Sequence, residues 1–144
     1  MLRVALIAGA CVGLLRADID FVTFAAANTW QQSSLIEHDS TVAKSQPGPH
    51  DGGGTTTAYS FFADAPNLHL VFRKRAIHSG AAIGYHRQTE DEIYYILSGV
   101  GELTLNGARS VVGPGTAILT RNGSSHGLRQ IGSADLVLII AYQQ

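Results

Sequence analysis

The feature that most constrains the fold is a series of short apolar segments that recur between residues 59 and 142, with glycine-rich or polar turns between them. This spacing is typical of an antiparallel β-sandwich or barrel, and no amphipathic helix of useful length interrupts it. The predicted strands are Tyr59–Phe62, Leu68–Ile77, Ala82–Arg87, Glu92–Leu97, Gly101–Leu105, Arg109–Val112, Ala117–Thr120 and Leu136–Tyr142. The pattern predicts an all-β domain, a double-stranded β-helix or jelly-roll barrel.

One turn in this series carries a specific signal. Asn106-Gly107 lies between two of the predicted strands. Both residue types tolerate positive φ, which a type I′ turn needs at its two central positions. We therefore predict a β-hairpin at this point.

Length and charge narrow the class of protein. With 144 residues, the chain is long enough for one domain with a substantial core. Charged residues make up 15% of the chain and the formal net charge is -1, so the basic surface of a nucleic-acid-binding protein is missing. The one sizeable basic cluster, Arg73-Lys74-Arg75, lies in a predicted strand, whose alternation divides it between two faces. We predict no nucleic-acid partner.

The residues before the barrel divide into two parts. We predict an apolar N-terminal extension (1–19), an arm with a Gly/Pro-rich loop (20–58) and the barrel itself (59–144). The apolar run Val4 to Leu15 is too short to span a bilayer and has about the length of a signal-peptide core. The following residues form a poor cleavage site, which favours a packed structural segment instead. We expect a cytoplasmic protein, or an exported one if residues 1–17 are a signal peptide.

The segment from Lys44 to Thr57, KSQPGPHDGGGTTT, is predicted to be a long irregular loop. It combines two prolines and four glycines with no apolar residue. A loop of this length is either mobile or a lid over a site. The mobile alternative is favoured, and His50 is the only residue that would give a lid a chemical role.

Metal-binding residue types gather between Gly80 and Gly99. His86 and Gln88 are two residues apart on a predicted strand, so their side chains share a face. A polar turn follows, and Glu92 opens the next strand. A hairpin of this kind can bring Glu92 beside His86.

These residues resemble the first motif of the cupin superfamily, G-x5-H-x-H-x3-E-x6-G. Gly80, His86, Glu92 and Gly99 match it, and Gln88 stands where the family usually has its second histidine. The second motif, G-x5-P-x-G-x2-H-x3-N, is matched by three residues. These are Gly115, Gly123 and His126, whereas Arg121 replaces the proline and Gln130 the asparagine. The resemblance covers roughly residues 60 to 142 and is closest to small single-domain cupins.

The resemblance implies a mononuclear divalent metal (Fe, Mn, Ni or Zn) held by His86, Glu92 and His126. Two imidazoles and a carboxylate form a facial triad with open coordination positions. Gln88 would be an auxiliary ligand through its carbonyl oxygen, and Glu92 would also act in catalysis as a proton acceptor. The alternative is a metal-free barrel in which these polar residues satisfy one another.

The function implied by this resemblance is metal-dependent chemistry on a small molecule. A dioxygenase or an isomerase-type enzyme is favoured, and a non-catalytic module that binds a small ligand is the alternative. A storage-like barrel is disfavoured, because it would not need His86, Glu92 and His126 together. A homodimer is expected, since the run Leu136 to Ile140 is apolar on both faces and so is covered on both.

Four further residues are candidates for substrate binding. Arg73 and Arg75 share a strand face and could clamp a carboxylate or phosphate, or could lie at the sheet edge in solvent. Tyr85 and Tyr94 could line the pocket, or could serve packing as most strand aromatics do.

Overall fold

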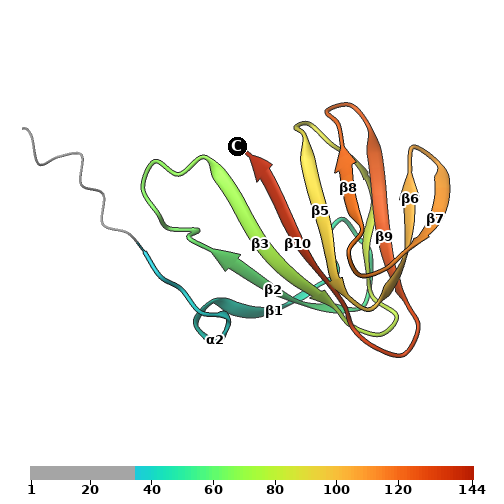
Figure 1. Ribbon diagram of the computed structural model, residues 1–144, viewed down its shortest axis with the longest axis horizontal. Helices are drawn as coiled ribbons and strands as arrows, with labels where there is room; N and C mark the ends of the chain where they lie inside the picture. The colour runs from blue at the N-terminus through green and yellow to red at the C-terminus, as the bar shows by residue number, and fades with distance from the viewer. Residues whose placement is uncertain (1–34) are drawn as a thin grey trace, which may run out of the picture. The chain divides into compact units, whose positions relative to one another are not determined.

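The structure, a computed structural model, describes residues 35–144 (Figure 1). The predictions for the extension 1–19 and for the first part of the arm lie outside the described residues. Within residues 35–144, no helix is long and apolar enough to cross a membrane. The only helix described is the four-residue α2 (Asp39–Val42). The strands are β1 (Ala43–Pro47), β2 (Thr55–Phe61), β3 (Leu70–Ile77), β4 (Ala82–Arg87), β5 (Glu92–Ser98), β6 (Val100–Leu105), β7 (Ala108–Val112), β8 (Ala117–Thr120), β9 (Ser125–Ile131) and β10 (Leu136–Gln143).

The strands form two antiparallel sheets, as Figure 1 shows. One has six strands in the order β1-β2-β3-β10-β5-β8, and the other has four in the order β4-β9-β6-β7. Strands distant in sequence are neighbours, so β10 at the C-terminus pairs with both β3 and β5. This arrangement confirms the predicted all-β jelly-roll fold.

The core lies between the sheets and follows from strand alternation. In β5, Tyr94 and Ile96 are buried whereas Ile93 and Tyr95 are exposed. The core consists of Ile77, Ala81, Ile83, Tyr94, Ile96, Leu103, Val112, Ile118, Leu128, Leu136, Leu138 and Ile140. Glu92 is buried on the same face of β5 as Tyr94. The first strand position therefore directs a carboxylate into the barrel.

The Asn106-Gly107 hairpin is confirmed. Asn106 has φ 48° and Gly107 has φ 83°, and they connect β6 to β7. Positive φ at both positions is the type I′ requirement. The turn sets Leu105 opposite Ala108 in the pairing of the two strands.

Two strands were not predicted from the sequence. β9 carries three buried residues in alternation, His126, Leu128 and Gln130, of which only one is apolar. Its polar inward face conceals the hydrophobic alternation by which a strand is recognised. β1 is exposed along its whole length and offers no apolar pattern at all.

The predicted irregular loop 44–57 is shorter and more ordered than expected. β1 and β2 occupy both of its ends, and the predicted barrel boundary at residue 59 falls within β2. We call residues 48–54, between them, the strap. Its backbone is held on β4, because Gly84 N–H donates to Pro49 O (2.9 Å) and Ala82 N–H donates to Gly53 O (3.3 Å). These hydrogen bonds hold the strap on the sheet, and the favoured alternative of a mobile loop stays a prediction.

Candidate metal centre

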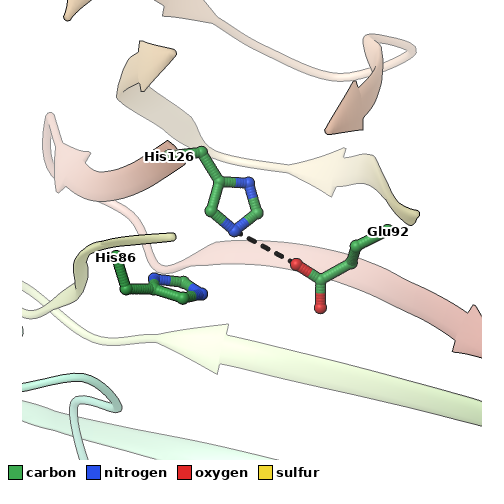
Figure 2. Close-up of side chains that lie close together, drawn as sticks. All are labelled: His86, Glu92 and His126. Atoms are coloured by element: carbon green, nitrogen blue, oxygen red, sulfur yellow. Dashed lines mark ion pairs between the residues drawn. The ribbon is translucent and has the colours of Figure 1, made fainter. Parts of the chain in front are cut away.

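Three strands bring the predicted ligand residues together. His86 on β4 is paired in register with His126 on the adjacent strand β9, and Glu92 begins β5 in the opposite sheet. Figure 2 shows the three side chains pointing toward a common region. Their ligand atoms all lie within 4.8 Å of one another. Residues 40 apart in sequence thus form one compact cluster, with Glu92 and His126 buried.

Hydrogen bonds at the outer nitrogens orient both imidazoles. His86 Nδ1 lies 2.8 Å from Gly84 O. A carbonyl only accepts, so this nitrogen carries the proton and Nε2 of His86 offers its lone pair toward the cluster. His126 Nδ1 lies 2.7 Å from Thr120 Oγ1, and its Nε2 lies 3.1 Å from Glu92 Oε2. Both rings therefore direct Nε2 into the cluster.

The buried side chain of Gln88 is also in the cluster. Its Nε2 lies 3.1 Å from His126 Nε2 and 3.4 Å from His86 Nε2, and it donates to Glu92 Oε2. The predicted fourth participant is therefore in place, with its amide nitrogen toward the ligands. Its role as a ligand through oxygen stays a prediction.

The donor set fits a divalent transition metal. Two imidazole nitrogens and one carboxylate oxygen, without thiolate, suit iron, manganese, nickel or zinc and leave coordination positions open. Metal–nitrogen bonds are about 2.0–2.1 Å long. The three ligand atoms, which lie within 4.8 Å of one another, are close enough to be shared by one ion.

Tyr94 borders the same cluster. Its hydroxyl lies 3.3 Å from His126 Nε2, and the two rings stack with centroids 4.8 Å apart. Burial, and then the charge of Glu92, raise the pKa of Tyr94 well above its ordinary value of 10.0. The phenol is therefore protonated at neutral pH and can donate a hydrogen bond.

A cavity of about 220 Å³ opens beside the cluster. Its lining includes three of the four cluster residues, namely His86, Gln88 and Glu92. Tyr94 and both arginines predicted to bind substrate also line it. Arg75 is buried and its Nη1 donates to Thr56 Oγ1 at 2.7 Å. Among the described residues, the buried Nε atoms of Arg73 and Arg75 have no hydrogen-bond partner. Burial, and then the neighbouring charge of Arg73, lower the pKa of Arg75.

Comparisons with known proteins agree with this geometry. The family model of the cupin domain (Cupin_2) matches residues 75–142, which include all three candidate ligands. A predicted oxalate decarboxylase from Thermotoga maritima has a similar structure, with a TM-score of 0.70, 24% identity, and coverage of 76% of this chain and 98% of its own. Residues 75–142 of this chain therefore form a cupin domain. The predicted resemblance is confirmed.

Two other relatives extend the comparison. An oxalate-binding protein from Thermotoga maritima is 34% identical over 71 residues, which is 49% of this chain and 59% of the relative's length. A polyketide cyclase from Streptomyces resistomycificus has a TM-score of 0.63 at 20% identity, with 77% of this chain and 80% of the cyclase covered. At this identity the structural likeness to the cyclase concerns the fold alone.

The two residues that differ from the second cupin motif both make side-chain contacts in the structure. Gln130, in place of asparagine, accepts from Gly80 N–H (3.0 Å) and donates to Gly132 O (3.1 Å) and Ala134 O (2.8 Å). Arg121, in place of proline, forms an ion pair with Asp91 at 3.2 Å. Gln130 therefore ties together two loops of the barrel, and neither substitution alters the ligand cluster.

Tyr85 is the one predicted substrate-binding residue that the structure places outside the cavity. It is 55% exposed and lines a separate groove with residues such as Glu102 and Arg109. It precedes His86 on β4, and successive strand residues point to opposite faces. With His86 directed inward, Tyr85 faces outward.

His50 joins the site from the strap. Its ring stacks on that of His86, with centroids 3.5 Å apart and planes inclined by 6°, and it lines the cavity. Burial, and then the charge of His86, lower the pKa of His50 from its ordinary value of 6.5, so the ring is neutral at pH 7. The sequence signal was a lone histidine in a Gly/Pro-rich segment, which did not indicate what the ring contacts.

Proposed function

We propose that this chain binds a divalent metal ion through His86, Glu92 and His126 and acts on a small carboxylate in the adjoining cavity. One observation carries the proposal: two of the three convergent ligands, His86 and Glu92, line the same cavity as the two guanidinium groups with unpartnered Nε atoms. Buried donors are costly to leave unpaired, so an anion between them would remove that cost. The name of the oxalate-binding relative supports a carboxylate as the ligand class.

The size of the cavity favours a small molecule. About 220 Å³ is below the range of roughly 300–1,000 Å³ that is common for drug-sized ligands. Arg73 and Arg75 would hold the carboxylate end, since guanidinium N–H groups match carboxylate oxygens in geometry and charge. Tyr94, as a protonated phenol, would donate to a substrate oxygen.

A metal-dependent enzyme is favoured over a binding module. A divalent cation would polarise a substrate oxygen and lower the pKa of the neighbouring group. Glu92 would hold the metal and accept a proton from the substrate, as dioxygenase- or isomerase-type reactions need. The binding module is the alternative, because none of the contacts described requires turnover.

Metal and ligand titrations test the proposal. Protein stripped with a chelator is titrated with Mn²⁺ by calorimetry, and then with oxalate as the probe carboxylate. We expect one Mn²⁺ per chain, lost in His126→Ala and in Glu92→Gln, and oxalate affinity reduced about tenfold in Arg75→Gln. Arg109→Gln is the matched control, since Arg109 is an exposed arginine outside the cavity.

Three results decide between the functions. If wild-type protein bound no Mn²⁺, the metal-dependent function would be wrong. Equal losses of oxalate affinity in Arg75→Gln and Arg109→Gln would remove the carboxylate assignment. Oxalate that is bound but recovered unchanged, together with other small carboxylates, would favour the binding module.

We further propose a homodimer formed through the outer face of the six-stranded sheet. Apolar side chains of neighbouring strands β5 and β8 are exposed on it: Ile93 (49%), Tyr95 (43%), Leu97 (43%) and Leu119 (49%). Contiguous exposed apolar patches typically mark interaction sites. A second copy would cover this face, in agreement with the apolar character of β10 on both sides.

A further inference from the structure

The amide nitrogen of Gln88 lies among the atoms that would hold the metal. It is 3.1 Å from His126 Nε2 and 3.4 Å from His86 Nε2, and it donates to Glu92 Oε2. These are the three residues of the candidate metal cluster. Gln88 is also buried, so solvent does not readily replace its contacts.

An amide NH₂ group and a cation are both attracted to atoms that offer lone pairs. The NH₂ group has two hydrogens and no acceptor, whereas a carboxylate and an unprotonated imidazole nitrogen offer lone pairs. His86 offers a lone pair at Nε2, because its Nδ1 proton is directed to Gly84 O. The amide therefore satisfies buried acceptors that a divalent cation would otherwise bind.

The two occupants require different spacings. Hydrogen-bond partners lie about 2.9–3.0 Å apart, whereas a metal lies about 2.0–2.1 Å from nitrogen ligands. The amide nitrogen and the cation thus cannot share the centre of the cluster. For the cation to bind, the ligands must close in by about 1 Å and the NH₂ group must leave or turn.

We propose that Gln88 competes internally with the metal ion and thereby lowers the affinity of the site. Half a rotation about the terminal torsion brings Oε1 to the place of Nε2. Carbonyl oxygen is repelled by the lone pairs of Glu92 and His86 unless a cation lies between them. The NH₂-inward orientation therefore opposes metal binding and must be given up before a cation can occupy the cluster.

This inference rests on the proposed function. One pair of variants distinguishes failure of the inference from failure of the proposed function. Gln88→Met keeps the approximate length of the side chain but has no N–H donor, and thioether sulfur is a poor ligand for Mn²⁺. Gln46→Met is the control, since Gln46 is an exposed residue of β1. Each stripped protein is titrated with Mn²⁺ by calorimetry, and its melting temperature is measured without and with Mn²⁺.

We expect Gln88→Met to melt at a lower temperature than wild type without metal and to bind Mn²⁺ about tenfold more tightly, because a charge-assisted hydrogen bond no longer has to be broken. Equal or weaker Mn²⁺ binding by Gln88→Met would overturn the inference while leaving the proposed function in place. Binding by neither protein would overturn both. Binding by Gln88→Met alone would support the inference.

A measurement on wild-type protein keeps the test decisive if Gln88→Met does not fold. The side-chain NH₂ resonances of Gln88, assigned through their proximity to His126, are followed by ¹⁵N NMR during titration with diamagnetic Zn²⁺. We expect them to shift strongly, while those of Gln130, a buried glutamine bonded to Gly132 O and Ala134 O, stay in place. Zn²⁺ binding without a change at Gln88 would overturn the inference.

Discussion

Thr120 Oγ1 lies 2.7 Å from Nδ1 of His126, and both residues are fully buried. If His126 binds a cation through Nε2, its proton resides on Nδ1 and is donated to the threonine hydroxyl. Thr120 therefore fixes the ring orientation of a candidate ligand from the neighbouring sheet, and can accept its Nδ1 proton, without being a ligand itself.

Replacement of this hydroxyl tests the relationship. We expect Thr120→Val to lower Mn²⁺ affinity about tenfold, as loss of an outer-shell hydrogen bond typically does. Calorimetric titration measures the affinity, and Thr104→Val on β6 is the control, because Thr104 lines the separate outer groove. Equal Mn²⁺ affinities in Thr120→Val and wild type would contradict this role for Thr120.

A substitution at Gly84 tests whether the contact of the strap with β4 stabilises the domain. A Cβ at this position would lie 1.8 Å from His50 O, a backbone atom that cannot move without the strap. We expect Gly84→Ala to destabilise the domain by about 2–4 kcal/mol, since a rigid clash must be relieved by displacement of the backbone. Thermal unfolding would show this as a lower melting temperature.

Gly113→Ala provides the matched control for Gly84→Ala. The nearest atom to a Cβ at Gly113 would be Gly99 O at 4.0 Å, and its φ is not in the left-handed region. We expect its melting temperature to stay close to that of wild type. Similar losses in the two variants would mean that the contact of Gly84 with the strap is not the cause.

The fold was largely predictable from the sequence, and the reasons are local. Strands such as β5 alternate cleanly between buried and exposed residues, and Asn106-Gly107 defines its own turn. β9 was missed because its inward residues include His126 and Gln130. A strand that supplies a polar site loses the apolar alternation that would reveal it.

The candidate site was predictable only where it follows motif spacing. His86, Glu92 and His126 could be found in this way, because fixed spacings on paired strands place their side chains together. The stacking of His50 on His86 depends on a strap folding back over β4, which no periodicity encodes. The inward amide nitrogen of Gln88 depends on the positions of three other residues. Such long-range contacts require the tertiary structure.

His50 is expected to serve the cavity more than the fold. Its ring is exposed apart from its stacking on His86, so we expect His50→Ala to change the free energy of unfolding by less than about 1 kcal/mol. Oxalate affinity of the Mn²⁺-loaded protein should fall about threefold to tenfold, because one wall of the cavity is removed. Calorimetry measures the affinity, with His69→Ala as an exposed control outside the cavity. Equal affinities in the two variants would exclude His50 from ligand binding.

The last prediction concerns the proposed dimer face. Ile93 is 49% exposed on β5, next to Leu119 on β8 in the register of the sheet. We expect Ile93→Lys to shift the protein from dimer to monomer in sedimentation velocity, since a charge buried against apolar side chains of a second copy is strongly unfavourable. Val111→Lys is the control: Val111 is 70% exposed on β7, in the other sheet. A wild-type protein that sediments as a monomer, or a dimer that persists in Ile93→Lys, would contradict this assignment of the face.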